Sequence, residues 1–367
     1  MNIEKIKKWV LCCWGKYTRQ KYYRRLRKNT KITKLTSAQK KEIQAYYMEN
    51  YGVKVGTKWH ELLYSISGAY RVNYMPFDVY SQLLERFSPY AFKKVLDDKV
   101  LYDWQLPDVK LPTRLFSSCN GVIYRYNGGG KTETSLSKLL ISLQNADNCI
   151  IKPSKDSSAG IGVRNLQIIN GLVSNYDGTL EDLVKSYKGN FVIEEKVICC
   201  DNLRVLNPSS CNTLRIHTWR NRTENKIEFV SAYLRVGRMD SFIDNAFAGG
   251  FAIPIGQEGI LTNSGCTLKN YRRYEKSDTG ITFKGYKIQQ FDEMVKVVCE
   301  AHHNLPHFDF VGWDVTVNNM NEVVVIEFNP DPDMRLDQLI FLDNCLLDKQ
   351  DKIYKELFKH DSISNQR

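Results

Sequence analysis

The chain has 367 residues, of which 43% are hydrophobic and 25% are charged. This balance suits a globular protein with a sizeable core and two or three subdomains. The sequence contains no apolar run near the length of a membrane span and no secretory leader pattern. Its ten cysteines include no C-x-x-C pair. Zinc and thioredoxin-like sites are therefore not predicted, and we expect a reduced, cytoplasmic protein.

The formal net charge of +11 is concentrated in an N-terminal arm. Residues 1–41 carry fourteen Lys or Arg and one acidic residue, a charge of +13, so the remaining chain carries −2. Aromatic residues such as Trp9 and Trp14 lie between these cations, which predicts a basic amphipathic helix. Such a helix can pack on the body of the protein, bind an anionic membrane surface through residues 1–35, or bind nucleic acid. We regard nucleic acid as the least favoured partner.

The next part of the chain is expected to be helical. Four helices are predicted by their apolar periodicity: Ser37–Val55, Trp59–Leu63, Asp78–Leu84 and Pro89–Leu96. Pro107 and Pro112 then interrupt the chain.

From about residue 115 short strands alternate with helices. Strands are predicted at Arg114–Phe116, Asn148–Lys152, Val163–Ile169, Phe191–Val197, Thr213–Arg220, Ile227–Val236, Phe251–Ile255, Val311–Val317 and Val323–Phe328. Helices are predicted at Ser135–Gln144, Leu180–Tyr187 and Phe291–His302. The pattern indicates an α+β fold with a largely antiparallel C-terminal sheet.

A metal site is predicted from the last two strands. Asp314 lies on the first, and Glu327 and Asn329 lie two residues apart on the second, so the latter two face the same side. A turn at residues 318–321 makes the strands a hairpin. If Asp314 pairs opposite the other two, three oxygen-bearing side chains converge. Such oxygen ligands suit Mg²⁺ that shares its shell with nucleotide phosphates. The alternative is a hairpin whose polar face is exposed to solvent and holds no metal.

A phosphate-binding loop is the second candidate. Lys152 ends a buried strand, and a loop with Ser157, Ser158, Gly160 and Gly162 follows. Small residues let backbone N–H groups approach a phosphate, and the lysine adds a positive charge. The loop matches neither a Walker motif nor a G-x-G-x-x-G fingerprint. An ordinary Gly-Ser turn is the alternative.

The strand Phe191–Val197 is a third candidate because it ends in polar residues. Glu194 and Glu195 precede Val197, and Asp201 follows. The strand can end at a nucleotide base, with Val197 covering the ring and a carboxylate accepting from ribose hydroxyls. The alternative is a strand that leaves the core at its charged end.

Arginines on neighbouring strands form the fourth candidate. Arg215 lies in N-T-L-R, and Arg235 and Arg238 lie in Y-L-R-V-G-R. Together they could clamp a phosphoryl group, or each could be a structural partner of a carboxylate. A polar and glycine-bearing segment follows them, with Asn245, Gly249 and Gly250.

These pieces, in this order, resemble the ATP-grasp superfamily. The likeness is greatest to the branch found with sugar-transfer and surface-polysaccharide genes, which includes the teichuronopeptide-biosynthesis-like proteins. It covers about residues 90–345. The segments that carry it are Asp97–Thr113, I-I-K-P-S-K-D-S-S-A-G-I-G-V, F-V-I-E-E-K-V, N-T-L-R-I, the D-N…G-G pair and the terminal D…E-x-N signature.

The resemblance implies an ATP-grasp fold, in which a small α+β lid subdomain and a larger antiparallel-sheet subdomain clamp ATP. We expect a basic arm at 1–41, a helical region at 42–114, the lid subdomain at 115–200, the sheet subdomain at 201–350 and a tail at 351–367.

The resemblance also assigns roles to individual residues. Lys99 and Lys152 match the two lysines on the ATP phosphates, and the Ser157–Gly162 loop matches the flexible lid. Glu194, Glu195 and Val197 match the adenine hinge, and Asp201 the ribose-binding acid. Asp314, Glu327 and Asn329 match the magnesium ligands. Arg215 and Arg235 match residues that hold phosphate and an acyl phosphate.

One position departs from the pattern of many carboxylate–amine ligases. Those proteins have an arginine two residues before the metal aspartate, whereas this chain has Gly312. Arg215 is a candidate to supply the missing charge.

By this resemblance the protein is an ATP- and Mg²⁺-dependent carboxylate–amine ligase that forms an acyl phosphate. Its substrates would be a carbohydrate or lipid-linked sugar, such as a hexuronic acid of a surface-polysaccharide precursor, and an amine. The acceptor-binding candidates are Arg238, Asn245, Gly249, Gly250 and Asp331. A sugar kinase and a non-catalytic nucleotide-binding module are the alternatives. The basic arm suggests a place at the inner face of the cytoplasmic membrane.

Overall fold

The computed structural model describes residues 23–24, 27–28, 30–128, 130–155, 160–246 and 248–358. Most of the expected basic arm, and Ser157 and Ser158 of the expected lid loop, lie outside these residues. The chain divides into two compact units, residues 1–86 with 333–367 and residues 87–332. In the described part, no helix has both the length and the apolar character that crossing a bilayer requires.

The first unit is helical. Its elements are α2 (Ser37–Tyr51), α3 (Lys58–Ser67), α4 (Phe77–Phe87, whose last residue belongs to the second unit), α11 (Asp337–Phe341), the 3₁₀ turn η3 (Leu347–Lys349) and α12 (Gln350–Phe358). Thr36 caps α2 in a capping box with Gln39, which satisfies two N–H groups that the helix cannot pair internally. Buried Tyr47 of α2 and Tyr354 of α12 bring the two ends of the sequence into one core.

Residues 351–358, the first part of the expected tail, form α12 together with Gln350 and bury Ile353 and Leu357. The helix α11 that precedes it has only five residues, Asp337–Phe341.

The second unit begins with α5 (Tyr90–Leu96), the 3₁₀ turn η1 (Lys99–Leu101) and α6 (Tyr102–Gln105). A six-stranded antiparallel sheet follows, with strands in the order β3-β2-β1-β8-β4-β5. Its elements are β1 (Arg114–Cys119), β2 (Val122–Asn127), β3 (Gly130–Thr134), α7 (Leu136–Leu143), β4 (Cys149–Pro153), β5 (Arg164–Leu166), α8 (Leu180–Ser186) and β8 (Phe191–Glu195). The small pair β6 (Ile168–Ile169) and β7 (Leu172–Val173) stands beside it.

Apolar residues of α7 and α8 cover one face of this sheet. Leu139 and Leu183 pack with Ile151 of β4 and Ile193 of β8 in one buried cluster. Because side chains alternate across a strand, Lys152 and Glu194 face the opposite side. The sequence analysis did not predict the hairpin β2–β3. Strand β3 is polar and exposed and gives no apolar signal, whereas β2, V-I-Y-R-Y-N, contains residues typical of strands.

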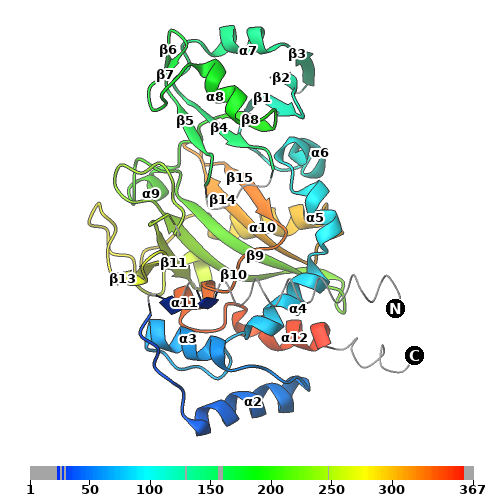
Figure 1. Cartoon of the computed structure of the whole chain (residues 1–367), viewed down its shortest axis with the longest axis vertical. Helices are drawn as coiled ribbons and strands as arrows, with labels where there is room; N and C mark the ends of the chain where they lie inside the picture. Colours follow the sequence, from blue (N-terminus) through cyan, green and yellow to red (C-terminus); the bar gives the residue numbers. More distant parts are fainter. Residues whose placement is uncertain are drawn as a thin grey trace. The chain divides into compact units, whose positions relative to one another are not determined.

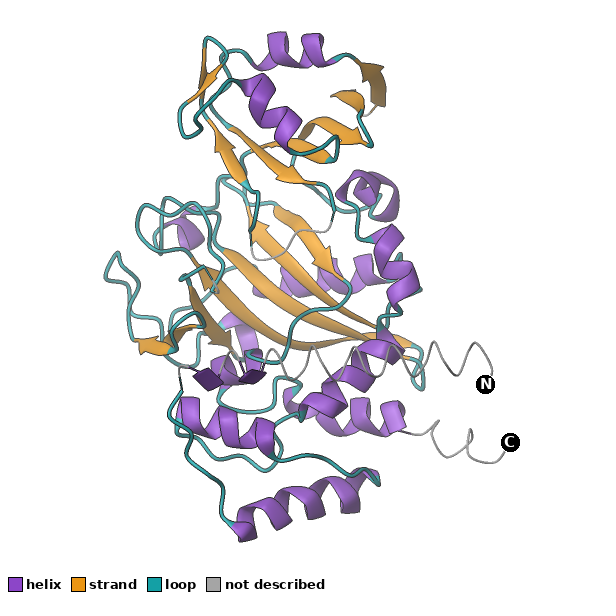
Figure 2. Ribbon diagram, viewed as in Figure 1, coloured by secondary structure: helices purple, strands orange, loops and turns teal. Residues whose placement is uncertain are grey.

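A seven-stranded antiparallel sheet completes the unit, with the order β13-β12-β11-β10-β9-β14-β15 (Figures 1 and 2). Its elements are α9 (Asp201–Arg204), β9 (Thr213–Asn221), β10 (Lys226–Val236), β11 (Phe251–Ile255), the 3₁₀ turn η2 (Gln257–Gly259), β12 (Gly265–Thr267), β13 (Arg272–Tyr274), α10 (Phe291–His302), β14 (Phe310–Val317) and β15 (Val323–Asn329). The five long strands and α10 were predicted, whereas β12 and β13 were not.

Helix α10 covers one face of this sheet and lies behind it in Figure 1. Met294 and Val298 of the helix pack with Ile216 of β9 and with Trp313 and Val315 of β14. The alternate residues of β9, β10 and β14 therefore face the other side, and this second face carries the charged side chains.

Candidate ATP and metal site

The hairpin on which the sequence analysis placed the expected metal ligands is present. Asp314 of β14 pairs directly with Glu327 of β15, and Gly312 pairs with Asn329. The turn lies at residues 318–322, where Asn318 accepts from the backbone N–H groups of Met320 and Glu322 at 3.0 and 2.9 Å. The three oxygen-bearing side chains thus start from one face of two adjacent strands.

A β-bulge produces this pairing. Val315 pairs with Val325, whereas Asp314 pairs with Glu327, so Ile326 is an extra residue in β15. A bulge reverses the alternation of the residues that follow it. Val325 and Phe328 consequently both point into the core with α10, and Glu327 is turned to the face of Asp314.

Two arginines hold Asp314. Arg215 lies opposite it on β9 and donates from Nε to Oδ1 at 2.6 Å and from Nη2 to Oδ2 at 3.2 Å. Arg235 of β10 donates from Nη1 to Oδ2 at 2.8 Å. Burial opposes ionisation of Asp314, but the two guanidinium groups hold its pKa well below the usual range.

Arg235 has a second acidic partner, Asp244, at 2.6 Å from its Nη2. Asp244 also accepts from the backbone N–H and the hydroxyl of Thr213. Asp244 is the aspartate of the D-N…G-G pair, and the sequence analysis assigned a role to its neighbour Asn245 and none to Asp244. The backbone carbonyl of Asn245 accepts from Gly250 N at 3.1 Å.

Gly312 is tightly enclosed. A Cβ at this position would lie 2.9 Å from Pro332 Cβ, 3.3 Å from Arg215 Cδ and 3.3 Å from His217 Cδ2. The space in which many relatives are expected to carry an arginine is therefore bordered by the side chain of Arg215. This arrangement supports the idea that Arg215 supplies the charge.

Lys99 connects the metal hairpin to the smaller sheet. Its Nζ lies 3.4 Å from Glu327 Oε2, and its backbone N–H donates to Ser154 O at 2.8 Å, just after β4. Burial would lower the pKa of this lysine, but the carboxylates of Glu327 and Asp97 raise it above the usual value. Asp97 itself is a half-buried acid whose pKa is raised to about 7 by its partial removal from water.

The smaller sheet contributes a second charged cluster. Glu194 of β8 is buried between Lys152, whose Nζ is 2.7 Å from Oε2, and Arg114, whose Nη2 is 3.1 Å from Oε1. Burial opposes ionisation of Glu194, but Lys152 and Arg114 hold its pKa below the usual value. The sequence analysis missed Arg114. The available signal was an arginine at the start of an otherwise apolar strand.

The remaining candidates lie in several places. Glu195 and Asp201 are exposed, and Val197 is half-buried. Asp201 forms an ion pair with Arg204 at 2.5 Å. Asp331 forms one with Lys93. Gly160 and Gly162 follow the undescribed residues 156–159 of the expected lid loop, and their φ of +74° and +78° favour glycine.

The described residues fit a magnesium site. No group of three or more His, Cys, Asp or Glu side chains is placed to hold a metal in the described part, so the set depends on two carboxylates and one amide. Asn329 is half-buried, and of its two amide atoms the carbonyl oxygen is the possible metal ligand, because the NH2 group only donates hydrogen bonds. This oxygen and the carboxylates of Asp314 and Glu327, which face each other, are donors that suit a Mg²⁺ ion sharing its shell with phosphate oxygens.

The family model for sugar-transfer-associated ATP-grasp proteins matches residues 79–353. The chain belongs to this family. The match confirms the expected superfamily, its sugar-transfer branch and the ATP-grasp fold. A search of curated proteins found no significant match.

Three of the solved structures to which the chain is similar are described below. The ATP-grasp ligase PsnB complexed with minimal precursor has a TM-score of 0.39 at 12% identity, over 75% of this chain and 63% of that chain. N5-carboxyaminoimidazole synthetase from Staphylococcus aureus with ADP has a TM-score of 0.37 at 12% identity, over 65% of this chain and 45% of that chain. The biotin carboxylase domain of Hydrogenobacter thermophilus 2-oxoglutarate carboxylase with MgADP has a TM-score of 0.41 at 12% identity, over 72% of this chain and 45% of that chain.

The matched region spans less than two thirds of each of these three chains. The family assignment depends on the family model. Two of these structures hold ADP, one of them with magnesium.

Proposed function

We propose that this ATP-grasp protein is an ATP- and Mg²⁺-dependent carboxylate–amine ligase. The observation that carries the proposal is the face shared by Arg215, Arg235, Asp314 and Glu327, with Lys99 joined to Glu327 at 3.4 Å. Two carboxylates beside three cations suit the transfer of a phosphoryl group, because the charge that develops on it needs fixed positive partners.

The proposed reaction has two steps. A carboxylate oxygen of the acceptor attacks the γ-phosphorus of ATP, and ADP leaves with the electrons of the broken P–O bond. The nitrogen of an amine then attacks the carbonyl carbon of the acyl phosphate, inorganic phosphate leaves, and the amine proton passes to solvent. Both steps depend on positioning and charge stabilisation more than on a nucleophilic side chain.

Roles follow for the residues of the site. Asp314, Glu327 and Asn329 would hold Mg²⁺, which neutralises phosphate charge when bound. Lys99 and Lys152 would bind the phosphates of ATP. Arg215 and Arg235 exchange ion pairs with Asp314 for contacts to the transferred phosphoryl group. Glu194, Glu195, Val197 and Asp201 would receive the adenosine.

The acceptor would be the carboxylate of a sugar, such as a hexuronic acid of a surface-polysaccharide precursor. The association of the family with sugar transfer supports this class of substrate. An acceptor built on a lipid carrier would place the protein at the cytoplasmic face of the membrane. The basic residues of 1–35 would then hold it there.

Trapping with hydroxylamine tests the ligase. With ATP, Mg²⁺ and a hexuronic acid, a ligase forms a hydroxamate, because hydroxylamine intercepts an acyl phosphate. ATP consumption that yields a stable phosphate ester on a hydroxyl would contradict the ligase and establish a sugar kinase. Nucleotide binding without ATP turnover under any of these conditions would indicate that the protein is a non-catalytic nucleotide-binding module.

A further inference from the structure

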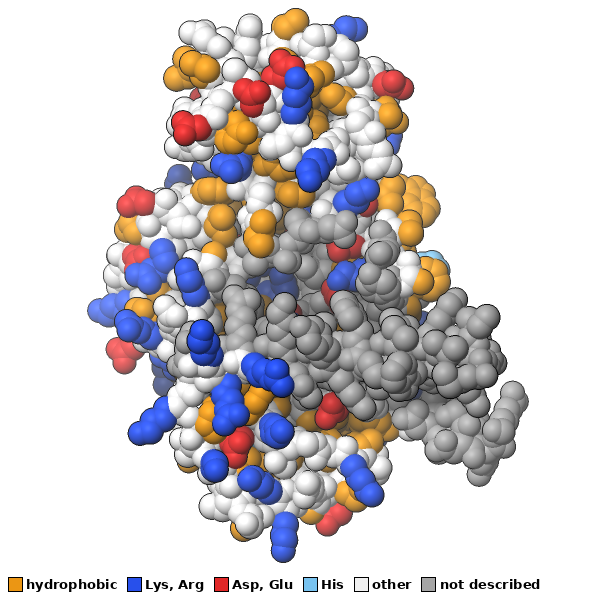
Figure 3. Space-filling view, viewed as in Figure 1, with side chains coloured by type: hydrophobic (Ala, Val, Ile, Leu, Met, Phe, Trp, Pro, Cys, Tyr) orange, Lys and Arg blue, Asp and Glu red, His pale blue; other side chains and the backbone are white. Residues whose placement is uncertain are grey.

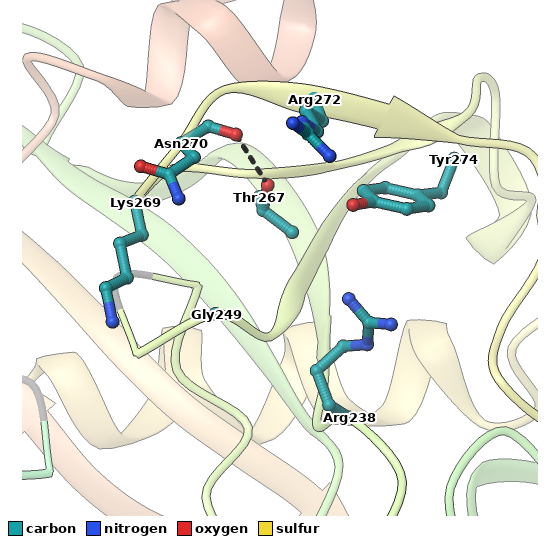
Figure 4. Close-up of a pocket in the computed structure, with 7 residues that line it drawn as sticks. All are labelled: Arg238, Gly249, Thr267, Lys269, Asn270, Arg272 and Tyr274. Carbon is teal, nitrogen blue, oxygen red and sulfur yellow. Dashed lines mark hydrogen bonds between the residues drawn. The ribbon is translucent and has the colours of Figure 1, made fainter. Parts of the chain in front are cut away.

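A basic pocket lies at the edge of the larger sheet, and one of its residues, Arg238, follows Arg235 by three positions. The pocket has a volume of about 210 Å³, and Arg238, Lys269, Arg272, Tyr274, Thr267, Asn270 and Gly249 line it (Figure 4). At ~30 Å³ per water molecule in the liquid, the space suits a phosphate or a diphosphate group. Lys and Arg side chains are also visible on this face around β13 (Figure 3).

The hairpin β12–β13 positions two of the cations. Thr267 of β12 pairs with Arg272 of β13, and Gly265 pairs with Tyr274, so Arg272 and Tyr274 share one face of the hairpin. Thr267 Oγ1 donates to Asn270 O at 3.2 Å, which fixes the turn that carries Lys269. In the described part of the chain, neither Lys269 nor Arg272 forms an ion pair or a hydrogen bond through its side chain.

Arg238 comes from the other side, two residues after the end of β10. Its Nε donates to Asp278 at 2.7 Å, and the guanidinium carbon lies 4.8 Å from the ring centre of Phe251 and 5.4 Å from that of Tyr274. These contacts orient the side chain toward the pocket (Figure 4). Asp278 balances one charge, so the three cations retain a net charge of about +2, which an anion would neutralise.

Residues 244–246 and 248–250 connect the candidate ATP site with the pocket. Asp244 binds Arg235, and Gly249 lines the pocket. A Cβ on Gly250 would lie 2.5 Å from Asp244 O, so Gly250 packs closely against the backbone of Asp244. An acceptor could place one group in the pocket and another near Arg235.

We propose that this pocket binds a phosphate or diphosphate group of the acceptor, which then presents its carboxylate to the candidate site. The inference rests on the proposed function for the identity of the acceptor, but the anion site itself is defined by Arg238, Lys269 and Arg272. A phosphate matches the pocket better than a neutral sugar, because two otherwise unpaired cations and a third on an aromatic support face one small space.

Binding of inorganic pyrophosphate tests the site directly. The full chain, with Mg²⁺ and a non-hydrolysable ATP analogue filling the nucleotide site, should bind pyrophosphate saturably in calorimetry. The double variant Lys269→Gln/Arg272→Gln should weaken this binding at least about tenfold, since each lost contact is a charge-assisted hydrogen bond. Lys284→Gln removes an exposed charge on the same connection before α10 and should change nothing.

The source of the phosphate is distinguished by two further probes. The experiment compares the KM values of two acceptors, a nucleoside-diphosphate hexuronic acid and a short-chain polyprenyl-diphosphate hexuronic acid. The kcat of ATP turnover is the reference. Whichever is the acceptor should show a KM raised about tenfold in the double variant and an unchanged kcat. Pyrophosphate binding that is absent, or that is equally weakened by Lys284→Gln, would overturn the inference. Absent ligase activity with intact pyrophosphate binding would overturn only the proposed function.

Discussion

Arg215 and Asp314 face each other across β9 and β14, and the arginine binds both oxygens of the carboxylate, at 2.6 and 3.2 Å. Arg235 shares one of these oxygens at 2.8 Å. The carboxylate expected to hold magnesium is therefore neutralised by the two side chains expected to hold phosphate. Binding of the nucleotide with its metal would exchange these partners, so that both arginines become available to the phosphoryl group.

The acidic pair can be tested by two isosteric variants. Asp314→Asn and Glu327→Gln should each lower ATP turnover at least about a hundredfold, because each removes a charge that balances the metal. Activity should be measured over a range of Mg²⁺ concentrations. Glu322→Gln is the control, since Glu322 lies in the turn of the same hairpin and pairs with Lys110. Wild-type turnover in both test variants at limiting Mg²⁺ would contradict the metal assignment.

Gly312 offers a test of how closely Arg215 is packed. Gly312→Ala places a methyl group 2.9 Å from Pro332 Cβ and 3.3 Å from Arg215 Cδ. Overpacking of this kind costs about 1–3 kcal/mol of stability, and displacement of Arg215 should lower turnover. Thermal unfolding and ATP turnover measure the two effects. Gly130→Ala, where a Cβ would meet nothing within 4 Å, should leave both unchanged.

Lys152 is expected to bind the ATP phosphates. Lys152→Ala removes that charge and also leaves buried Glu194 with only Arg114 as a cationic partner. Affinity for ATP should fall about tenfold or more in calorimetry, and stability should fall as well. The control is Lys138→Ala, on the exposed side of α7. Equal affinity in the wild type and the Lys152 variant would remove this role from Lys152.

Stability should depend on pH through buried histidines. Burial lowers the pKa of His302 to about 3, and the neutral ring accepts from Thr218 at 2.7 Å while its Nε2 donates to Phe308 O at 2.9 Å. In the unfolded chain the His302 side chain binds a proton below about pH 6.5, whereas in the folded protein it stays neutral down to about pH 3. The stability that depends on the neutral ring is therefore fully present above about pH 6.5. It is lost as the pH falls, by up to about 1.4 kcal/mol per pH unit for each such histidine.

Unfolding measured between pH 7 and pH 5 checks this sign. His302→Gln should be less stable at pH 7 and should show a shallower loss on acidification. Exposed His303→Gln should keep the slope of the wild type. A slope that is the same in all three proteins would show that His302 is not the group that titrates on unfolding.

The N-terminal arm gives a prediction about membranes. Its charge of +13 against −2 for the remaining chain favours an anionic surface, with about 1 kcal/mol for each engaged cation. The full chain should sediment with anionic liposomes at low salt and be released by high salt. Removal of residues 1–35 should abolish sedimentation and leave turnover of soluble substrates unchanged. Binding to a nucleic-acid duplex without binding to liposomes would favour nucleic acid as the partner of the arm.

Much of the fold could be predicted from the sequence. The strands Thr213–Arg220 and Val311–Val317 alternate apolar residues with polar ones, and α10 has a clear apolar side, so local patterns were sufficient. The hairpins β2–β3 and β12–β13 were missed because β12 and β13 have only three residues each and β3 is polar and exposed. Such strands are stabilised by pairing with neighbours that are distant in the sequence, and no local window contains that information.

The sequence by itself determined which residue types the site contains: acids on two successive strands, a lysine before a glycine-bearing loop, and arginines on neighbouring strands. Only the tertiary structure decided how they meet. With regular pairing outward from Val315 and Val325, Asp314 would face Ile326, and Glu327 would point into the core. The bulge at Ile326 instead places Glu327 opposite Asp314. An extra residue in one strand is stabilised by packing of the whole sheet, here with Val325 and Phe328 both in the core against α10.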